Sequence, residues 1–240
     1  MSSKGFVLAL VLTLIFFVSG VYAIDVNVSS GNSSGTGMTA DQSMKKLMEG
    51  NDRFVSGKVC HPNQSAERRA EVVSAQHPHP FAVVVSCSDS RVPPEILFDQ
   101  GIGDIFVIRT AGEVMDNATL GTIEYAVEHL NIPLIVVMGH DNCGAVKAAV
   151  TGEAPGHINY LVEAIKPAVN KAKGMKGDLL NNAIDINTHD VVAQLEATKP
   201  ILSEAVKEGK LKIVGARYHL DSGAVEILRD DSHIYNREHC

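Results

Sequence analysis

Two runs of apolar and β-branched residues, at positions 81–85 and 134–138, restrict most strongly what this chain can fold into. Runs of this length without polar alternation are typical of strands that are buried on both faces of a parallel sheet. Helical patterns follow these runs along the chain, which indicates βαβ units. We therefore expect a three-layer α/β/α fold. Its central sheet is expected to hold about four parallel strands and a C-terminal antiparallel strand, preceded by an N-terminal helical arm.

The spacing of apolar residues and the turn signals predict the individual elements. The expected strands cover residues 81–86, 104–110, 134–138 and 211–220, with a return strand at 224–228. The expected helices cover residues 39–55, 65–75, 92–97, 119–130, 144–150, 158–173 and 185–208, the last with a break or kink at Pro200.

The N-terminal segment has the features of a signal peptide. Lys4 precedes an almost wholly apolar stretch at residues 6–18, and Val21 and Ala23 fit the small-residue cleavage pattern. We expect residues 1–23 to be removed near Ala23, which makes the mature protein periplasmic or secreted. If the segment stays uncleaved, it is a membrane anchor instead.

The rest of the chain is predicted to form a linker and one domain. Residues 24–38 are rich in Ser, Gly and Asn and are expected to be a disordered linker. A chain of 240 residues that is 45% hydrophobic can bury one substantial core, so residues 39–240 are assigned to a single domain. Its first part, residues 39–76, is the helical arm.

The formal net charge of -7 argues against a nucleic-acid partner.

Residues that bind metals follow both apolar runs. Cys87 comes shortly after the first run, and His140 and Cys143 come after the second. The carboxyl ends of parallel strands meet at one edge of a sheet, so these side chains are expected to lie together. Two thiolates and an imidazole suit Zn²⁺, and three protein ligands leave a fourth position for water. The pattern therefore predicts one catalytic zinc ion per subunit.

The four cysteines also allow another interpretation. In an oxidising compartment they could form two disulfides. Cys87 and Cys143 suit metal ligation better, because each lies beside other ligand-type residues. Cys60 and Cys240 remain, and they could pair with each other, pair between chains or stay free.

Asp89 and Arg91 lie two and four residues after Cys87. An arginine can hold a carboxylate with two hydrogen bonds and keep it ionised. Such a carboxylate can accept a hydrogen bond from a metal-bound hydroxide and so orient it. It could also become a fourth metal ligand and close the site, and a surface ion pair or a helix cap is the simpler alternative.

Several motifs together resemble one enzyme family. They are Cys-Ser-Asp-Ser-Arg-Val, Phe-Val-Ile-Arg-Thr-Ala-Gly, Ile-Glu-Tyr-Ala-Val and Gly-His-x-x-Cys-Gly. Over roughly residues 44–228 the sequence resembles the β-class carbonic anhydrases. The resemblance implies reversible hydration of CO₂ to bicarbonate and a proton by a metal-bound hydroxide, with Asp89 and Arg91 as the catalytic pair. The alternatives are a zinc hydrolase of carbon disulfide or carbonyl sulfide on the same scaffold, and a non-catalytic protein with a structural zinc.

The resemblance also implies a substrate pocket. Its residues would be Gln76, Val92, Phe106, Tyr125 and Gly144. Tyr125 is expected to reach into the site of the partner subunit. Gln76 lies 11 residues before Cys87, farther than in the family pattern, and Gln64 is the second match.

The expected assembly rests on the same resemblance. It implies a homodimer in which the helical arms wrap around the partner subunit, and it allows a dimer of dimers. Members of the family that close at low pH carry a tryptophan three residues before the first cysteine ligand. Here that residue is Val84, and the chain contains no tryptophan, so an open site is expected.

Overall fold

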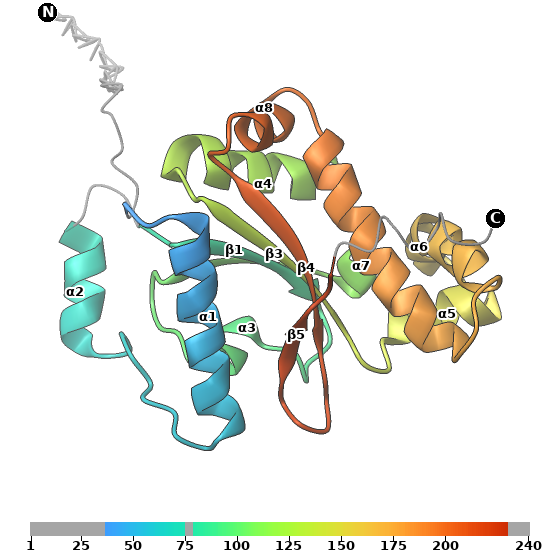
Figure 1. The fold of residues 1–240 in the computed structure, drawn as a ribbon, viewed down its shortest axis with the longest axis horizontal. Coiled ribbons are helices and arrows are strands. Elements are labelled where there is room, and N and C mark those ends of the chain that lie inside the picture. Colours follow the sequence, from blue (N-terminus) through green and yellow to red (C-terminus); the bar gives the residue numbers. More distant parts are fainter. Residues whose placement is uncertain (1–36, 75–78, 230–240) are drawn as a thin grey trace, which may run out of the picture. The chain divides into compact units, whose positions relative to one another are not determined.

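A five-stranded sheet is the middle layer of the structure, a computed structural model that describes residues 37–74 and 79–229 (Figure 1). The strand order is β2-β1-β3-β4-β5, and the first four strands are parallel to one another while β5 is antiparallel to β4. The strands are β1 (Ala82–Cys87), β2 (Ile105–Thr110), β3 (Leu134–His140), β4 (Lys212–Tyr218) and β5 (Val225–Ile227). The predicted three-layer fold and its mixed sheet are confirmed.

The helices follow the predicted pattern with one correction. They are α1 (Ala40–Val55), α2 (Ala66–Ser74), α3 (Pro94–Leu97), α4 (Asn117–Leu130), α5 (Gly144–Thr151), α6 (Ile158–Ala172), α7 (Leu179–Ala197) and α8 (Ile201–Lys207). The predicted start at residue 185 is wrong, because Asp178 caps α7 by accepting a hydrogen bond from the backbone N–H of Asn181. The break at Pro200 is confirmed, and α8 follows it.

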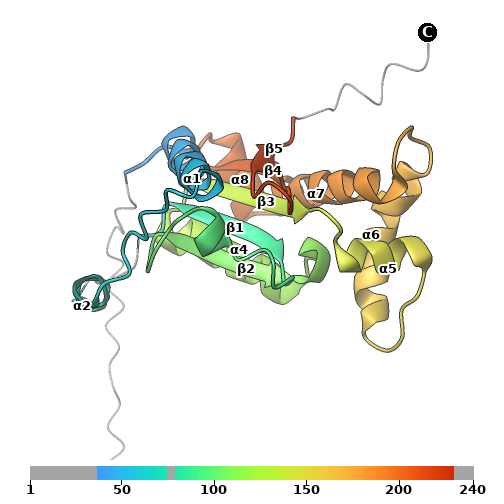
Figure 2. The same cartoon turned by 90° about the horizontal axis from the view of Figure 1, so that it is seen from below.

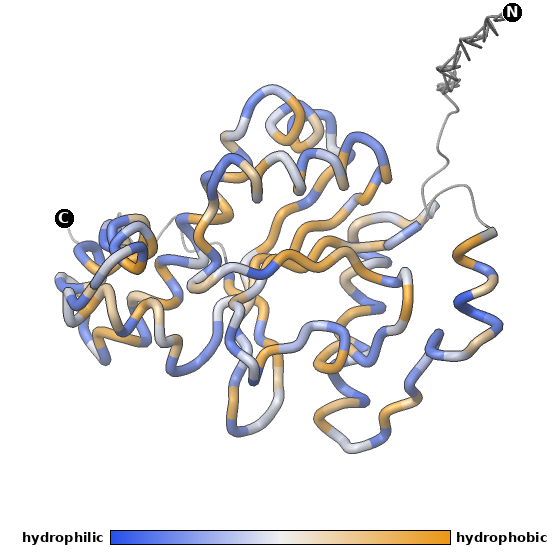
Figure 3. Tube along the Cα trace, turned by 180° about the vertical axis from the view of Figure 1, so that it is seen from behind, coloured by the Kyte–Doolittle hydropathy of each residue, from blue (hydrophilic) through white to orange (hydrophobic). Residues whose placement is uncertain are grey.

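Three apolar clusters hold the layers together. On one face of the sheet, α1 and α3 pack against β1 and β3, and α4, α7 and α8 cover the other face (Figure 1). Figure 2 shows α5 and α6 together beyond the strand ends. The third cluster joins α5, α6 and the first half of α7 beyond the carboxyl ends of the strands. Every residue of β1 and β3 is buried, and both strands stand out as apolar in Figure 3. Burying one Val, Ile or Leu side chain completely stabilises the fold by about 1.5–3 kcal/mol. Because both faces of β1 and β3 are buried, neither run alternates with polar residues.

The predictions for the chain termini lie largely outside the described residues. Residues 1–36 and Cys240 are not described, so the signal peptide and most of the linker stay predictions. The assignment of residues 39–240 to a single domain stays a prediction in the same way. Within the described ranges, no helix has the length and apolar character needed to cross a bilayer.

Helix α1 packs on the sheet of its own subunit. Leu47 is fully buried in the cluster that contains β1 and β3. The side chain of Asn51 is also buried and makes three hydrogen bonds. Its Nδ2 donates to the carbonyl oxygens of Leu97 and Gly223, at 3.1 and 2.9 Å, and its Oδ1 accepts from the N–H of Val225 at 2.9 Å. Asn51 therefore ties the helical arm to α3 and to the β4–β5 connection.

This contact predicts a measurable loss of stability. Replacing Asn51 with Ala leaves two carbonyl groups and one N–H without that partner, so we expect the free energy of unfolding to fall by about 2–4 kcal/mol. Urea denaturation measures the change. Lys45→Ala on the same helix is the control, because Lys45 forms an exposed ion pair with Glu49, and such pairs contribute little. Equal effects of the two substitutions would contradict the role assigned to Asn51.

Candidate metal centre

The ends of β1 and β3 bring the three ligand-type residues together. Cys87 is the last residue of β1 and His140 the last of β3, and the two strands are neighbours in the sheet. Asn142 then adopts a left-handed conformation with φ of 52°, which asparagine tolerates better than most residues. The turn places Cys143 at the N-cap of α5. The end of β3 and the turn that follows it therefore place both His140 and Cys143 beside Cys87.

The spacing of the donor atoms fits a metal ion. Cys87, His140 and Cys143 are buried, and their ligand atoms all lie within 4.8 Å of one another. The two sulfurs are 4.0 Å apart. Two sulfurs on a tetrahedral zinc ion, with Zn–S bonds of about 2.3 Å, lie about 3.8 Å apart, whereas a disulfide bond measures about 2.05 Å. The geometry is thus one that could hold a metal ion, and both cysteines are free.

The ring of His140 presents one nitrogen to this site. Its Nδ1 lies 2.8 Å from the carbonyl oxygen of Asp141, which can only accept, so Nδ1 carries the proton and donates. The other nitrogen, Nε2, is buried and has no hydrogen-bond partner among the described residues. A buried lone pair without a partner is costly, and metal coordination satisfies it.

The two thiols share one negative charge. A hydrogen bond from Cys143 lowers the pKa of Cys87, against the effect of burial, and the hydrogen bond from the Gly112 N–H acts in the same direction. The same bond and burial raise the pKa of Cys143, and the carboxylate of Glu113 adds to this rise. A second thiolate in this buried pair requires a cation beside it, which a divalent metal ion supplies.

Asp89 and Arg91 form a two-point pair next to the ligands. Arg91 donates from Nε to Oδ1 of Asp89 at 2.9 Å and from Nη2 to Oδ2 at 2.7 Å, and its backbone N–H also donates to Oδ1. The guanidinium holds the pKa of the Asp89 carboxyl well below its usual range. The carboxylate is therefore ionised and its orientation is fixed.

Two residues of the β2 end support Cys87 in ways that the sequence did not indicate. Arg109 donates from Nε to the carbonyl oxygen of Cys87 at 2.9 Å and from Nη2 to that of Asp89 at 2.5 Å. Gly112 donates its N–H to Sγ of Cys87 at 3.4 Å. Gly112 has φ of 67°, a left-handed conformation that strains any residue with a side chain, and a Cβ there would also lie 2.6 Å from Cδ1 of Ile165.

Glu113 is a further residue that sequence reasoning missed. Its side chain is buried, its Oε1 has no hydrogen-bond partner in the described part of the chain, and Asn187 donates a hydrogen bond to the carboxyl group. Burial raises the pKa of Glu113 well above its usual value, and the charge of Cys87 raises it further. No spacing or motif around position 113 indicates a buried acid.

The residues of the expected substrate pocket are spread over several elements. Val92 is buried in the cluster on the α1 side of the sheet, whereas Phe106 on β2 packs against the cluster on the α4 side. Tyr125 on α4 is 51% exposed, and its ring lies 5.0 Å from that of His129 in a tilted arrangement. Gly144 is the first residue of α5, and a Cβ at this position would meet no atom within 4 Å. Gln76 lies outside the described residues.

The fold and the donor set are those of an α/β protein with a metal-type site at the carboxyl ends of neighbouring parallel strands. Comparison with known proteins identifies the family. The family model for "Carbonic anhydrase" matches residues 82–225. The chain therefore belongs to the carbonic anhydrase family, and its structural neighbours place it in the β class. Its enzymatic activity is that of a carbonic anhydrase.

Individual relatives support this assignment. The chain is 47% identical over 188 residues to a carbonic anhydrase of Mycolicibacterium smegmatis, which covers 76% of this chain and 90% of that protein. It is also 47% identical over 197 residues to carbonic anhydrase 2 of Mycobacterium tuberculosis, covering 80% and 93%. Among solved structures, the β-carbonic anhydrase CcaA is similar with a TM-score of 0.61 and 27% identity, covering 78% of this chain and 95% of that chain.

The donor geometry predicts how metal content depends on each cysteine. We expect Cys87→Ala to lower the bound zinc per chain from about one to well below one, because two donors hold a divalent ion much more weakly than three. Elemental analysis of the purified protein measures the ratio. Cys60→Ser is the matched control, since Cys60 is an exposed free cysteine away from the donor group. Full zinc content in Cys87→Ala would contradict the assignment.

Proposed function

We propose that this chain catalyses the reversible hydration of CO₂ to bicarbonate and a proton with one zinc ion held by Cys87, His140 and Cys143. The proposal rests on one observation above all. Three buried donor atoms lie within 4.8 Å of one another, and the Asp89 carboxylate, fixed by Arg91, lies next to them without belonging to the group. A structural zinc site with four protein ligands would not require such a pair.

A bound zinc ion would supply hydroxide at neutral pH by lowering the pKa of a coordinated water. The residues of the chain then orient the reactants. Asp89 stays ionised because of Arg91, so its carboxylate can accept a hydrogen bond but cannot donate one. By accepting a hydrogen bond from the attacking water, Asp89 would turn a lone pair of the water oxygen towards CO₂. His140 and the two cysteines exclude bulk water from the donor group because all three are buried. Of the pocket residues, Gly144 has open space in front of its backbone, which suits a small substrate.

The role of Asp89 predicts a separation of activity from metal binding. We expect Asp89→Ala to lower kcat/KM for CO₂ hydration by at least about 100-fold, because the attacking oxygen loses its orienting acceptor. Zinc content should stay near one per chain. Stopped-flow hydration assays and elemental analysis measure the two quantities. Asp41→Ala, which removes a carboxylate from an exposed ion pair with Lys212, should leave both unchanged. Full activity of Asp89→Ala would refute the proposed mechanism.

We further propose that the fourth metal position is open. Both carboxylate oxygens of Asp89 are engaged by Arg91, and Val84 stands where a tryptophan accompanies the closed form of related enzymes. X-ray absorption of the zinc protein should therefore report two sulfurs, one imidazole nitrogen and one solvent oxygen at both pH 6 and pH 9. Replacement of the solvent oxygen by a carboxylate at pH 6 would contradict the open form.

We also propose an exported homodimer. The N-terminal pattern at residues 6–23 supports export, and the half-exposed edge strand β2 together with exposed Tyr125 on α4 supports contact with a second subunit. The mass of the mature chain should correspond to cleavage near Ala23, and light scattering should give at least twice that mass. A purified protein that keeps residues 1–23 would contradict cleavage, and a monomeric mass would contradict the homodimer.

A further inference from the structure

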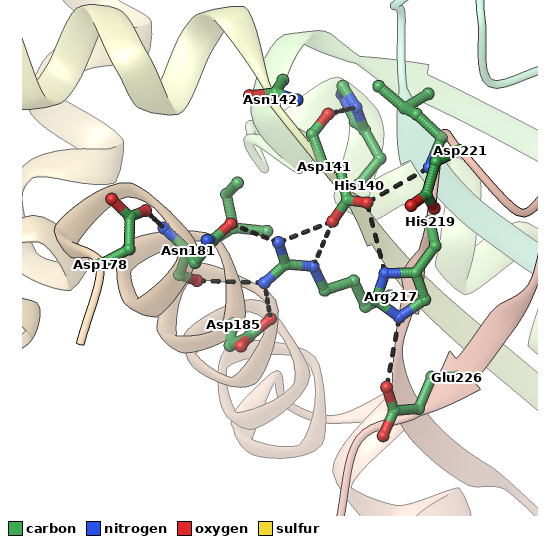
Figure 4. A network of polar contacts seen from close by, with 12 residues as sticks. His140, Asp141, Asn142, Asp178, Asn181, Asp185, Arg217, His219, Asp221 and Glu226 are labelled. Carbon is green, nitrogen blue, oxygen red and sulfur yellow. Dashed lines mark hydrogen bonds and ion pairs between the residues drawn. The ribbon is translucent and has the colours of Figure 1, made fainter. Parts of the chain in front are cut away.

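Arg217 on β4 occupies the centre of a polar network beside the metal centre (Figure 4). Its side chain is only 10% exposed. Nε and Nη2 lie 2.8 and 2.6 Å from Oδ1 of Asp141. Nη1 donates to Oδ1 of Asp185 at 2.9 Å and to the carbonyl oxygen of Asn181 at 3.3 Å, and Nη2 donates to Oδ1 of Asn181 at 2.6 Å. Four N–H groups of the guanidinium thus donate hydrogen bonds, and Nη2 also lies within ion-pair distance of Asp141.

Asp141 is held from several sides by this network and by the β4–β5 connection. Its Oδ1 faces Arg217, while its Oδ2 accepts from the N–H of Leu220 at 3.2 Å and lies 3.3 Å from Nδ1 of His219. Its own N–H donates to the carbonyl oxygen of Tyr218 at 3.1 Å. The backbone of Asp141 therefore has little freedom to move relative to β4.

This backbone is what orients the imidazole of His140. The carbonyl oxygen of Asp141 accepts the hydrogen bond from Nδ1 of His140, which fixes both the ring orientation and the tautomer that leaves Nε2 free to bind a metal. We propose that Arg217 is a positioning residue for the metal ligand His140, acting through Asp141. This inference rests on the proposed zinc site.

The geometry explains why this position needs an arginine. Its planar guanidinium donates on one side to Asp141, in the loop after β3, and on the other side to Asn181 and Asp185 on α7. The planar shape fixes the directions of these hydrogen bonds. A lysine has three donors around a single nitrogen and cannot meet acceptors on both sides. Removal of the guanidinium also takes away the cation that pairs with both the Asp141 and the Asp185 carboxylate.

The test compares zinc affinity in Arg217→Lys and Arg217→Ala with that of the parent protein. Competition with a chromophoric chelator measures the affinity, and we expect both substitutions to lower it by about 10–100-fold, as for other groups that orient a histidine ligand. Cobalt-substituted protein gives a second readout, because a displaced imidazole changes the intensity of the visible absorption bands. ¹⁵N spectra of histidine-labelled protein should show loss of a single fixed His140 tautomer.

Arg53→Ala is the matched control. Arg53 donates from Nε to Oδ2 of Asp99 at 2.6 Å, and Asp99 is otherwise held by the backbone N–H groups of Cys60 and His61. This substitution also removes a largely buried Arg–Asp pair, so it should lower stability while leaving zinc affinity and the cobalt spectrum unchanged. If the Arg217 variants behave like Arg53→Ala, Arg217 has a structural role only and the inference is overturned.

Two further results keep the test decisive. Should Arg217→Ala fail to fold, Asn181→Ala is measured instead. It removes one side-chain acceptor of the Arg217 guanidinium and should lower zinc affinity by a smaller factor, about 3-fold. An unchanged affinity overturns the inference.

The parent protein is measured first for zinc binding and CO₂ hydration. A parent that binds no zinc refutes the proposed function, whereas a zinc-binding parent with unaffected Arg217 variants refutes only the positioning role.

Discussion

The candidate metal centre depends on the parallel pairing of β1 with β3. The register aligns Ser86 with Met138, so the two strands end at the same edge of the sheet. Neighbouring parallel strands require a crossover between them, and here the chain passes through α3, β2 and α4 before it returns. This is why Cys87 and His140 meet in space although 53 residues separate them.

Three arginines stabilise the segments that carry the donor atoms. Arg91 fixes the carboxylate of Asp89, Arg109 fixes the backbone at Cys87 and Asp89, and Arg217 fixes Asp141 beside His140. They come from three different parts of the chain: Arg91 lies in the loop after β1, Arg109 lies on β2, and Arg217 lies on β4. Because their guanidinium groups each meet two or more acceptors, they restrict direction as well as distance. The three guanidinium groups therefore hold the donor-bearing segments in one geometry.

The agreement between expectation and structure differs from element to element. The β1 and β3 runs predicted their strands because burial on both faces leaves no polar positions. The start of α7 was misplaced because the polar residues near Asn181 carry no apolar period, while the cap at Asp178 is a local side-chain contact. Arg217 and Glu113 left no signal, since their partners Asp141 and Asn187 lie more than 70 residues away in the chain.

The sequence by itself determined the types of element, the donor set and the family motifs, because hydrophobic periodicity and local spacing are encoded residue by residue. It also predicted that Cys87, His140 and Cys143 come from two strand ends. Only the tertiary structure decided the rest: the tautomer of His140, the charge shared by the two sulfurs, the burial of Glu113 and the network around Arg217. These properties depend on which groups distant in the chain come within hydrogen-bond distance and lose contact with water, and that is a consequence of packing.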